Sequence, residues 1–265
     1  MIFKNIRSLV GRLFSENIQM RIVLVLSDFF WFLRKYFLAI EIKYPDEFLN
    51  NWKTIKANTS QDKERNFTIY QLIKTYNSIF KEQETNLIEF GVDRGGTLTT
   101  ISKFLKPNTK IFALDSFGYY AKEIKNKVTD FDPHYQGMYK PFTKKTRFHN
   151  FDYSKLEVKL NEEILQKKNC KVKIVKCYFP DIIEKKILDE ISSKKFSFVH
   201  FDFDLFVPTS EAIKFIRPKL AQNAILLFDD YNNINQEGVK HAVEKSGLDI
   251  SKSIQTQSGQ LICWL

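Results

Sequence analysis

The sequence predicts an α/β domain with a mostly parallel sheet covered by helices on both faces, preceded by an N-terminal helical extension. From residue 67 onward, short apolar segments that end in Gly or Asp alternate with segments whose apolar residues recur at helical spacing. This alternation implies right-handed crossovers between parallel strands. The chain has 265 residues, 43% hydrophobic and 15% aromatic, which is enough for one domain core and an appendage.

The N-terminal part differs from the rest. Residues 22–33 and 36–40 are largely apolar, and basic residues flank them. A spanning helix needs about 20 apolar residues, and this stretch is shorter and carries charges. No small-residue cleavage site follows, so no secretory signal is expected. We expect residues 1–60 to form a helical extension that packs on the domain or on a second copy in a homo-oligomer. The alternative is peripheral membrane contact through residues 1–45.

The elements follow in order along the chain. Residues 46–66 are polar and are expected to be a loop or linker, with the main domain starting at residue 61. The predicted strands are short apolar runs at 86–91, 110–115, 170–176, 196–202, 224–229 and 260–265. The predicted helices are amphipathic segments at 67–80, 97–105, 209–216 and 237–245. Residues 119–150 fit neither pattern, and we expect this insert to be a functional lid.

Charge and cysteine usage limit the function classes. The net charge is +10, but only 8 of the 41 basic residues are Arg, the residue suited to bidentate phosphate and base contacts. We therefore expect no nucleic-acid partner. The three cysteines form no Cys-x-x-Cys pair, which argues against a disulfide framework and a cysteine zinc site. A cytoplasmic location fits best, with the inner face of the membrane as an alternative.

A glycine-rich turn follows the first predicted strand. Gly91 and Gly95 let the backbone turn tightly and approach a ligand, at the sheet edge where open α/β domains bind ligands. The turn is neither Gly-x-Gly-x-x-Gly nor a P-loop, which argues against NAD and ATP. Asp115 ends the second strand twenty residues after Gly95, the spacing of an acid that accepts hydrogen bonds from ribose hydroxyls. The alternative for Asp115 is a cap on the loop that follows it.

Two pairs of acids follow the fourth and fifth predicted strands. Asp202 and Asp204 come after the fourth strand, and Asp229 and Asp230 after the fifth. Adjacent strands lie about 5 Å apart, so up to four carboxylates are expected to meet. Like charges this close need a compensating cation, and oxygen ligands favour Mg²⁺. The alternative is a set of separate loop caps and exposed charges.

Taken together, these motifs resemble a known family. The motifs in chain order are Glu89–Gly96, Asp115–Gly118, Asn150–Phe151, Phe179–Asp181, Asp202–Phe206, Asp229–Tyr231 and Gly238–Val243. This series resembles the macrocin O-methyltransferase family, the S-adenosylmethionine-dependent, Mg²⁺-dependent sugar O-methyltransferases of macrolide and aminocoumarin biosynthesis. The resemblance covers about residues 85–247. Family members usually have Gly at Cys177 and Tyr at Phe206, so the acceptor stays open.

The resemblance implies a class I methyltransferase fold with a seven-stranded Rossmann-like sheet. It assigns the metal to Asp202, Asp229 and Asp230 and makes Asp204 a candidate general base. His134 and His149, in or beside the insert, are alternative bases. The residues expected to bind S-adenosylmethionine are Glu89, Gly91, Gly95, Asp115 and Ser116.

The expected function is S-adenosylmethionine-dependent, Mg²⁺-dependent O-methylation of a hydroxyl on a sugar or glycosylated substrate. The metal would lower the pKa of the hydroxyl and the base would take its proton. Two alternatives stay open: a catalytically silent methyltransferase-like interaction module at a membrane surface, and an NAD-dependent nucleotide-sugar enzyme.

Overall fold

The computed structural model describes residues 42–59, 61–81, 83–117, 128–132, 151–179 and 183–265. The chain divides into two compact units, Met1–Tyr44 and Pro45–Leu265, and the second is described below. The predicted extension lies mostly outside the described residues. Its role, the boundary predicted at residue 60 and the lid therefore stay predictions. In the described part of the chain, no helix has both the length and the apolar character needed to cross a membrane.

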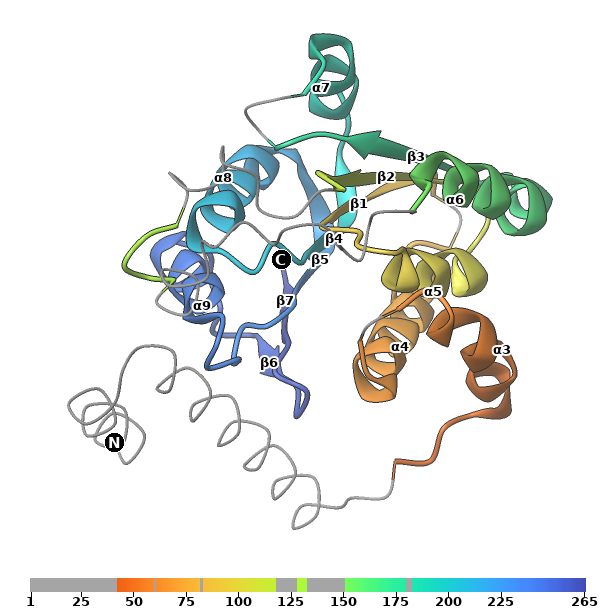
Figure 1. Cartoon of the computed structure of the whole chain (residues 1–265), viewed down its shortest axis with the longest axis horizontal. Coiled ribbons are helices and arrows are strands. Elements are labelled where there is room, and N and C mark those ends of the chain that lie inside the picture. Colours follow the sequence, from red (N-terminus) through yellow and green to blue (C-terminus); the bar gives the residue numbers. More distant parts are fainter. Residues whose placement is uncertain (1–41, 60, 82, 118–127, 133–150, 180–182) are drawn as a thin grey trace. The chain divides into compact units, whose positions relative to one another are not determined.

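The described residues form one sheet of seven strands in the order β3-β2-β1-β4-β5-β7-β6 (Figure 1). The strands are β1 (Thr85–Phe90), β2 (Thr109–Asp115), β3 (Lys171–Lys176), β4 (Phe196–Phe201), β5 (Leu220–Phe228), β6 (Ile254–Gln255) and β7 (Leu261–Trp264). Strands β1 to β5 pair in parallel, whereas β7 runs antiparallel to both β5 and β6. The predicted mostly parallel sheet is confirmed.

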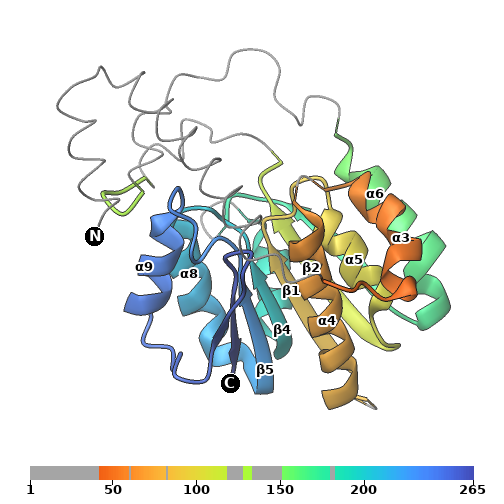
Figure 2. The same ribbon diagram turned by 90° about the horizontal axis from the view of Figure 1, so that it is seen from below.

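Helices cover both faces of the sheet (Figure 2). The α-helices are α3 (Asp46–Lys56), α4 (Lys63–Ile79), α5 (Gly96–Phe104), α6 (Tyr153–Leu160), α7 (Lys185–Ser192), α8 (Phe206–Ile216) and α9 (Glu237–Lys245). Shorter turns are η2 (Asn161–Leu165), η3 (Gln166–Lys168) and η4 (Arg217–Lys219). Alternation along β4 separates the faces: Phe198 contacts Tyr76 of α4, whereas Val199 clusters with Ile213 of α8.

A row of stacked phenylalanines crosses the sheet just before its carboxyl edge. Phe90 of β1 lies 5.6 Å from Phe201 of β4, and Phe201 lies 4.5 Å from Phe228 of β5, measured between ring centroids. Each ring is almost completely buried, which stabilises the fold by roughly 1.5–3 kcal/mol per side chain. Because Gly91, Asp202 and Asp229 follow these rings directly, the aromatic row positions the backbone from which the site is built.

The expectation that residues 46–66 form a loop is wrong for most of that stretch. Helix α3 occupies Asp46–Lys56, and α4 begins at Lys63. Phe48 and Ile55, seven residues apart and so on one helical face, are both fully buried. The ring of Phe48 lies 5.2 Å from that of Phe67 on α4. The half-buried ring of Trp52 also stacks on Phe48 at 5.8 Å, so a few apolar side chains dock a helix that is polar at most of its positions. Helices α6 and α7 and strand β6 are also additions to the prediction.

Candidate active site

The turn between β1 and α5 is built so closely that only glycine fits. Gly91 has φ +88°, and a Cβ there would lie 2.0 Å from the backbone oxygen of Asp202. Gly95, the N-cap of α5, has φ +82°, and a Cβ there would lie 2.3 Å from Cδ2 of Leu156. The Asp202 amide also donates to the Phe90 carbonyl at 2.7 Å. The glycine turn and the end of β4 are therefore direct neighbours.

Asp115 organises this turn. Its Oδ2 accepts hydrogen bonds from the amides of Val92 at 2.6 Å and Asp93 at 2.8 Å, and its Oδ1 accepts from the Phe117 amide at 2.6 Å. Burial raises the pKa of Asp115, and these backbone donors oppose the rise. The capping role is thus present, while the ribose role of Asp115 stays a prediction. Ser116, which follows it, is partly buried.

Glu89 lies beneath the turn. Its carboxylate is 1% exposed, and Oε1 is 3.1 Å from Nδ1 of His200, its partner across β1 and β4. Burial raises the pKa of Glu89, against the effect of His200. Among the described residues, Glu89 Oε2 and His200 Nε2 have no hydrogen-bond partner. His200 was not predicted as a site residue. The available signal was one imidazole in the apolar run Phe196–Phe201.

The two acid pairs meet, as predicted. Phe201 of β4 pairs with Phe228 of β5, so the residues that follow these two strands are adjacent. Asp202, Asp204 and Asp230 each offer a carboxylate oxygen, and these oxygens lie within 4.8 Å of one another. Asp204 and Asp230 have φ +63° and +55°, a left-handed conformation that is uncommon for a residue with a side chain. This oxygen-only set fits a hard divalent cation.

The fourth acid, Asp229, is engaged by three side chains. Its Oδ2 accepts from Arg65 Nη1 at 2.7 Å and from Gln61 Nε2 at 3.1 Å, and its Oδ1 accepts from Gln260 Nε2 at 2.8 Å. Arg65 Nη2 also donates to Asp230 Oδ1 at 2.7 Å. The predicted metal ligands Asp202 and Asp230 thus lie in the cluster, and the predicted ligand Asp229 lies beside it, where donors already occupy both of its oxygens.

Gln61, Arg65 and Gln260 were not among the predicted site residues. Gln61 and Arg65 lie in the stretch interpreted as a loop, and Gln260 at the start of the last predicted strand. Arg65 lies in the first turn of α4, where a positive charge opposes the helix dipole and favours an acidic partner. Because the helix was predicted to begin only at residue 67, this signal could not be read from the sequence.

Burial and mutual repulsion shift the pKa values of the acids at this edge. Burial, followed by the neighbouring carboxylates, raises the pKa of Asp202 well above its usual range. Burial also raises the pKa of Asp229, with Arg65 opposing. Burial alone would lower the pKa of Arg65, but Asp229 and Asp230 raise it above its ordinary value. Among the described residues, Arg65 is thus the guanidinium that pairs with Asp229 and Asp230.

The described part of the insert packs beside the acids. Asp132 Oδ1 accepts a hydrogen bond of 2.8 Å from the amide of Phe206, the first residue of α8, two positions after Asp204. The ring of Phe131 lies 4.5 Å from that of Phe206. Both candidate histidines of this region, His134 and His149, lie outside the described residues.

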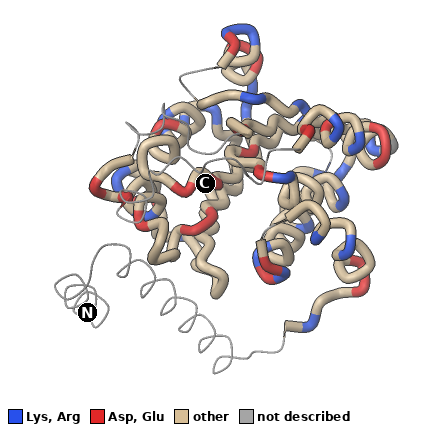
Figure 3. The backbone as a smooth tube through the Cα atoms, viewed as in Figure 1, with Lys and Arg blue, Asp and Glu red and all other residues tan. Residues whose placement is uncertain are grey.

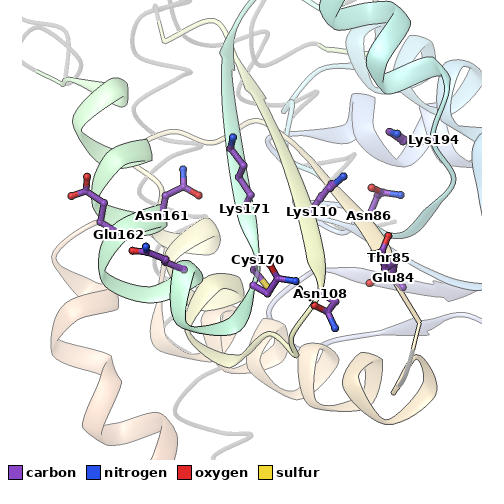
Figure 4. Close-up of a pocket in the computed structure, with 12 residues that line it drawn as sticks. Glu84, Thr85, Asn86, Asn108, Lys110, Asn161, Glu162, Cys170, Lys171 and Lys194 are labelled. Atoms are coloured by element: carbon purple, nitrogen blue, oxygen red, sulfur yellow. Dashed lines mark hydrogen bonds between the residues drawn. The ribbon is translucent and has the colours of Figure 1, made fainter.

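A separate cavity lies at the opposite, amino-terminal edge of the sheet (Figure 4). It measures about 850 Å³ and is lined by residues at the starts of β1, β2 and β3, among them Thr85, Lys110 and Lys171. It contains none of the predicted site residues.

The Lys and Arg residues of the described domain lie on many elements (Figure 3). The chemistry points to the carboxyl edge, where the glycine turn and the acids meet.

Comparison with known proteins identifies the class. The family model described as Macrocin-O-methyltransferase (TylF) matches residues 57–249. A search of curated proteins gave no match. CalS11, a calicheamicin methyltransferase, is 18% identical with a TM-score of 0.56, covering 85% of this chain and 95% of its own. The O-methyltransferase NovP is 16% identical with a TM-score of 0.56, covering 78% of this chain and 81% of its own.

A second structure of CalS11, described as a TDP-rhamnose 3'-O-methyltransferase, is 17% identical with a TM-score of 0.53, covering 85% of this chain and 97% of its own. At these identities the likeness concerns the fold, and the sheet is the seven-stranded sheet of class I S-adenosylmethionine-dependent methyltransferases. The match to a methyltransferase family argues against both alternatives, the catalytically silent module and the NAD-dependent nucleotide-sugar enzyme. Because the family model spans well over half of it, the chain belongs to the macrocin O-methyltransferase family and is an O-methyltransferase.

Proposed function

We propose that this enzyme transfers the methyl group of S-adenosylmethionine to a hydroxyl of a sugar or glycosylated acceptor, with Mg²⁺ at the acid cluster. One observation carries the proposal: Asp202 both touches Gly91 of the glycine turn and belongs to the acid cluster. A methyl donor bound at the turn and an acceptor hydroxyl bound at the acids would then lie next to each other, on either side of Asp202. The family name and the rhamnose named for CalS11 support a sugar acceptor.

The methyl donor would bind along Gly91, Gly95, Asp115 and Ser116. The glycines leave open backbone for close approach, and Asp115 keeps the turn in one shape through its backbone bonds. Glu89 would contribute to this site from the end of β1, where its buried carboxylate contacts His200. S-Adenosylmethionine supplies an electrophilic methyl group, and the protein contributes alignment of the acceptor oxygen with it.

The acids would prepare the acceptor. Mg²⁺ bound by Asp202, Asp229 and Asp230 would lower the pKa of an acceptor hydroxyl. Asp204 would accept the proton from that hydroxyl. The close approach of Asp204 to Asp202 and Asp230 supports the alternative that Asp204 is a ligand. His134 or His149 would then be the base.

A methyl-transfer screen tests the function. Purified full-length protein is incubated with methyl-labelled S-adenosylmethionine and a panel of nucleotide sugars that includes TDP-rhamnose, with Mg²⁺ or with chelator. We expect label on a sugar in Mg²⁺ and loss of transfer in chelator. Full activity in chelator removes the metal from the mechanism, and label on none of the sugars or glycan fragments removes the sugar acceptor.

Cellular placement is part of the proposal. We infer a cytoplasmic enzyme, with residues 1–45 forming an oligomer contact or a peripheral contact with the inner face of the membrane. The flanking basic residues support the membrane contact. Flotation of the full chain with anionic liposomes but not with neutral ones would support it. Absence of flotation together with a dimer in light scattering would favour the oligomer contact.

A further inference from the structure

Arg65 binds two of the three carboxylates that are proposed to hold the metal ion. It lies in the first turn of α4, where the helix dipole disfavours a positive charge, and its own amide is capped by Asp62 Oδ1 at 2.8 Å. Its two terminal nitrogens go to two different carboxylates, Asp229 and Asp230, both at 2.7 Å. The capped turn fixes the start of the side chain, and the acids fix its end.

The pairing is shielded from water. The side chain of Arg65 is 18% exposed, and those of Asp229 and Asp230 are 1% and 8% exposed. A carboxylate buried to this degree without a partner is strongly destabilising, so the guanidinium replaces water as the source of compensation. In the part of the chain that the structure describes, Arg65 forms the ion pairs with both of these acids.

Gln61 extends the same contact. Its Nε2 donates to Asp202 Oδ2 at 3.2 Å as well as to Asp229, and its Oε1 accepts from Thr97 Oγ1 of α5 at 3.3 Å. Gln61 and Arg65 together therefore reach three of the four acids. We name this pair of side chains the acid latch.

We propose that the acid latch and a divalent cation compete for the same carboxylates, so that Arg65 stabilises the metal-free enzyme and weakens metal binding. This inference rests on the metal site of the proposed function. If Asp229 Oδ2 or Asp230 Oδ1 is to ligate a cation, one of its present hydrogen bonds has to break, because each of these oxygens already accepts from Arg65 and from a second donor, Gln61 or Asn233. The charge of the guanidinium adds repulsion of the cation.

Direct binding of Mn²⁺, followed by electron paramagnetic resonance on the full-length protein, tests the competition. In Arg65→Met, we expect Mn²⁺ to bind about tenfold tighter or more than in the wild type. Arg65→Lys keeps the charge but can pair with one carboxylate at a time. Its affinity for Mn²⁺ should therefore fall between those of wild type and Arg65→Met. Arg217→Met is the matched control, since Arg217 is exposed, donates to the Ser246 carbonyl and precedes β5, whereas Asp229 and Asp230 follow the other end of that strand.

Thermal unfolding in chelator gives the second readout. Arg65→Met should unfold at a lower temperature than wild type and Arg217→Met, and Mn²⁺ should recover more stability in it than in wild type. An Arg65→Met protein that folds only with metal supports the competition. If it folds under neither condition, the Arg65→Lys affinity decides. Equal or weaker Mn²⁺ binding in the Arg65 variants overturns the inference while leaving the metal site intact. Absence of Mn²⁺ binding in every protein, wild type included, overturns the metal site and the inference with it.

Discussion

The two halves of the carboxyl edge satisfy their buried charges in different ways. At the end of β2, the Asp115 carboxylate accepts from three backbone amides of tight turns, with the side chain of the adjacent Ser116 as a further partner. At the end of β5, the Asp229 carboxylate accepts from three side chains, those of Gln61, Arg65 and Gln260. Backbone amides move only when the turn moves, whereas side chains can rotate into other rotamers.

In the proposed function, this difference would separate a preformed cradle, the turn held by Asp115, from an exchangeable site at Asp229. The half at Asp115 keeps one shape, which would suit a methyl donor that is the same in every cycle. The half at Asp229 has partners that can be replaced, which would suit the proposed uptake of a metal and an acceptor. Four changes test the contrast, from the largest expected effect to the smallest.

The largest effect is expected at Asp204. If Asp204 is the base, Asp204→Asn should lower turnover by about 10²–10⁴-fold and leave Mn²⁺ affinity unchanged. Single-turnover assays across a metal titration measure both quantities. Asp202→Asn is the comparison, since a lost ligand should be partly rescued by high Mg²⁺. Rescue of Asp204→Asn by metal would make Asp204 a ligand instead.

Gly91→Ala should destabilise the point where the two halves touch. The left-handed φ costs about 1–2 kcal/mol, and the clash with the Asp202 carbonyl adds roughly 1–3 kcal/mol. Gly259→Ala is the matched control, because Gly259 has φ +90° but the nearest atom to an added Cβ lies 3.8 Å away. Urea unfolding should therefore give a clearly larger loss for Gly91→Ala. Equal losses of unfolding free energy would mean that the close approach of Gly91 to the Asp202 carbonyl does not contribute to the destabilisation.

Asp115→Asn probes the cradle alone. The amide keeps one acceptor oxygen and turns a donor toward backbone amides, so the free energy of unfolding should fall by about 1–3 kcal/mol. Calorimetry should also find weaker S-adenosylmethionine binding and an unchanged Mn²⁺ affinity. Asp249→Asn is the control, since Asp249 also accepts from a backbone amide, at Ser251, but is not buried. Unchanged cofactor affinity in Asp115→Asn would remove Asp115 from the cofactor site.

The smallest effect concerns Cys177, whose amide donates to the Asp115 carbonyl at 2.8 Å. Burial, with a smaller contribution from Asp115, raises the pKa of the Cys177 thiol to about 12 from an ordinary value near 9. Between these values the unfolded chain ionises and the folded one does not, so stability is lost as pH rises. At pH 10 the free energy of unfolding of the wild type should have fallen by about 1 kcal/mol relative to that of Cys177→Ala. Below pH 8 the pH should not change this difference. A pH-independent difference would contradict the burial of the thiol.

Much of the fold could be read from the chain because its signals are local. The six strands predicted from apolar runs such as 110–115 correspond to β1–β5 and β7, with shifts at their ends. Helix α3 could not be found this way. Its fully buried residues, Phe48 and Ile55, are two of only four apolar residues among eleven, and the seven polar residues conceal that pattern.

For the site, the sequence by itself determined which acids and glycines gather at the carboxyl edge. Parallel strands must end on one edge, so Asp202 and Asp229 had to be neighbours once β4 and β5 paired. Only the tertiary structure decided their partners. Arg65 and Asp229 are separated by 164 positions, and no local pattern links a residue on α4 to the end of β5. That contact depends on how helices pack on the sheet, which is settled by the sum of many weak side-chain contacts.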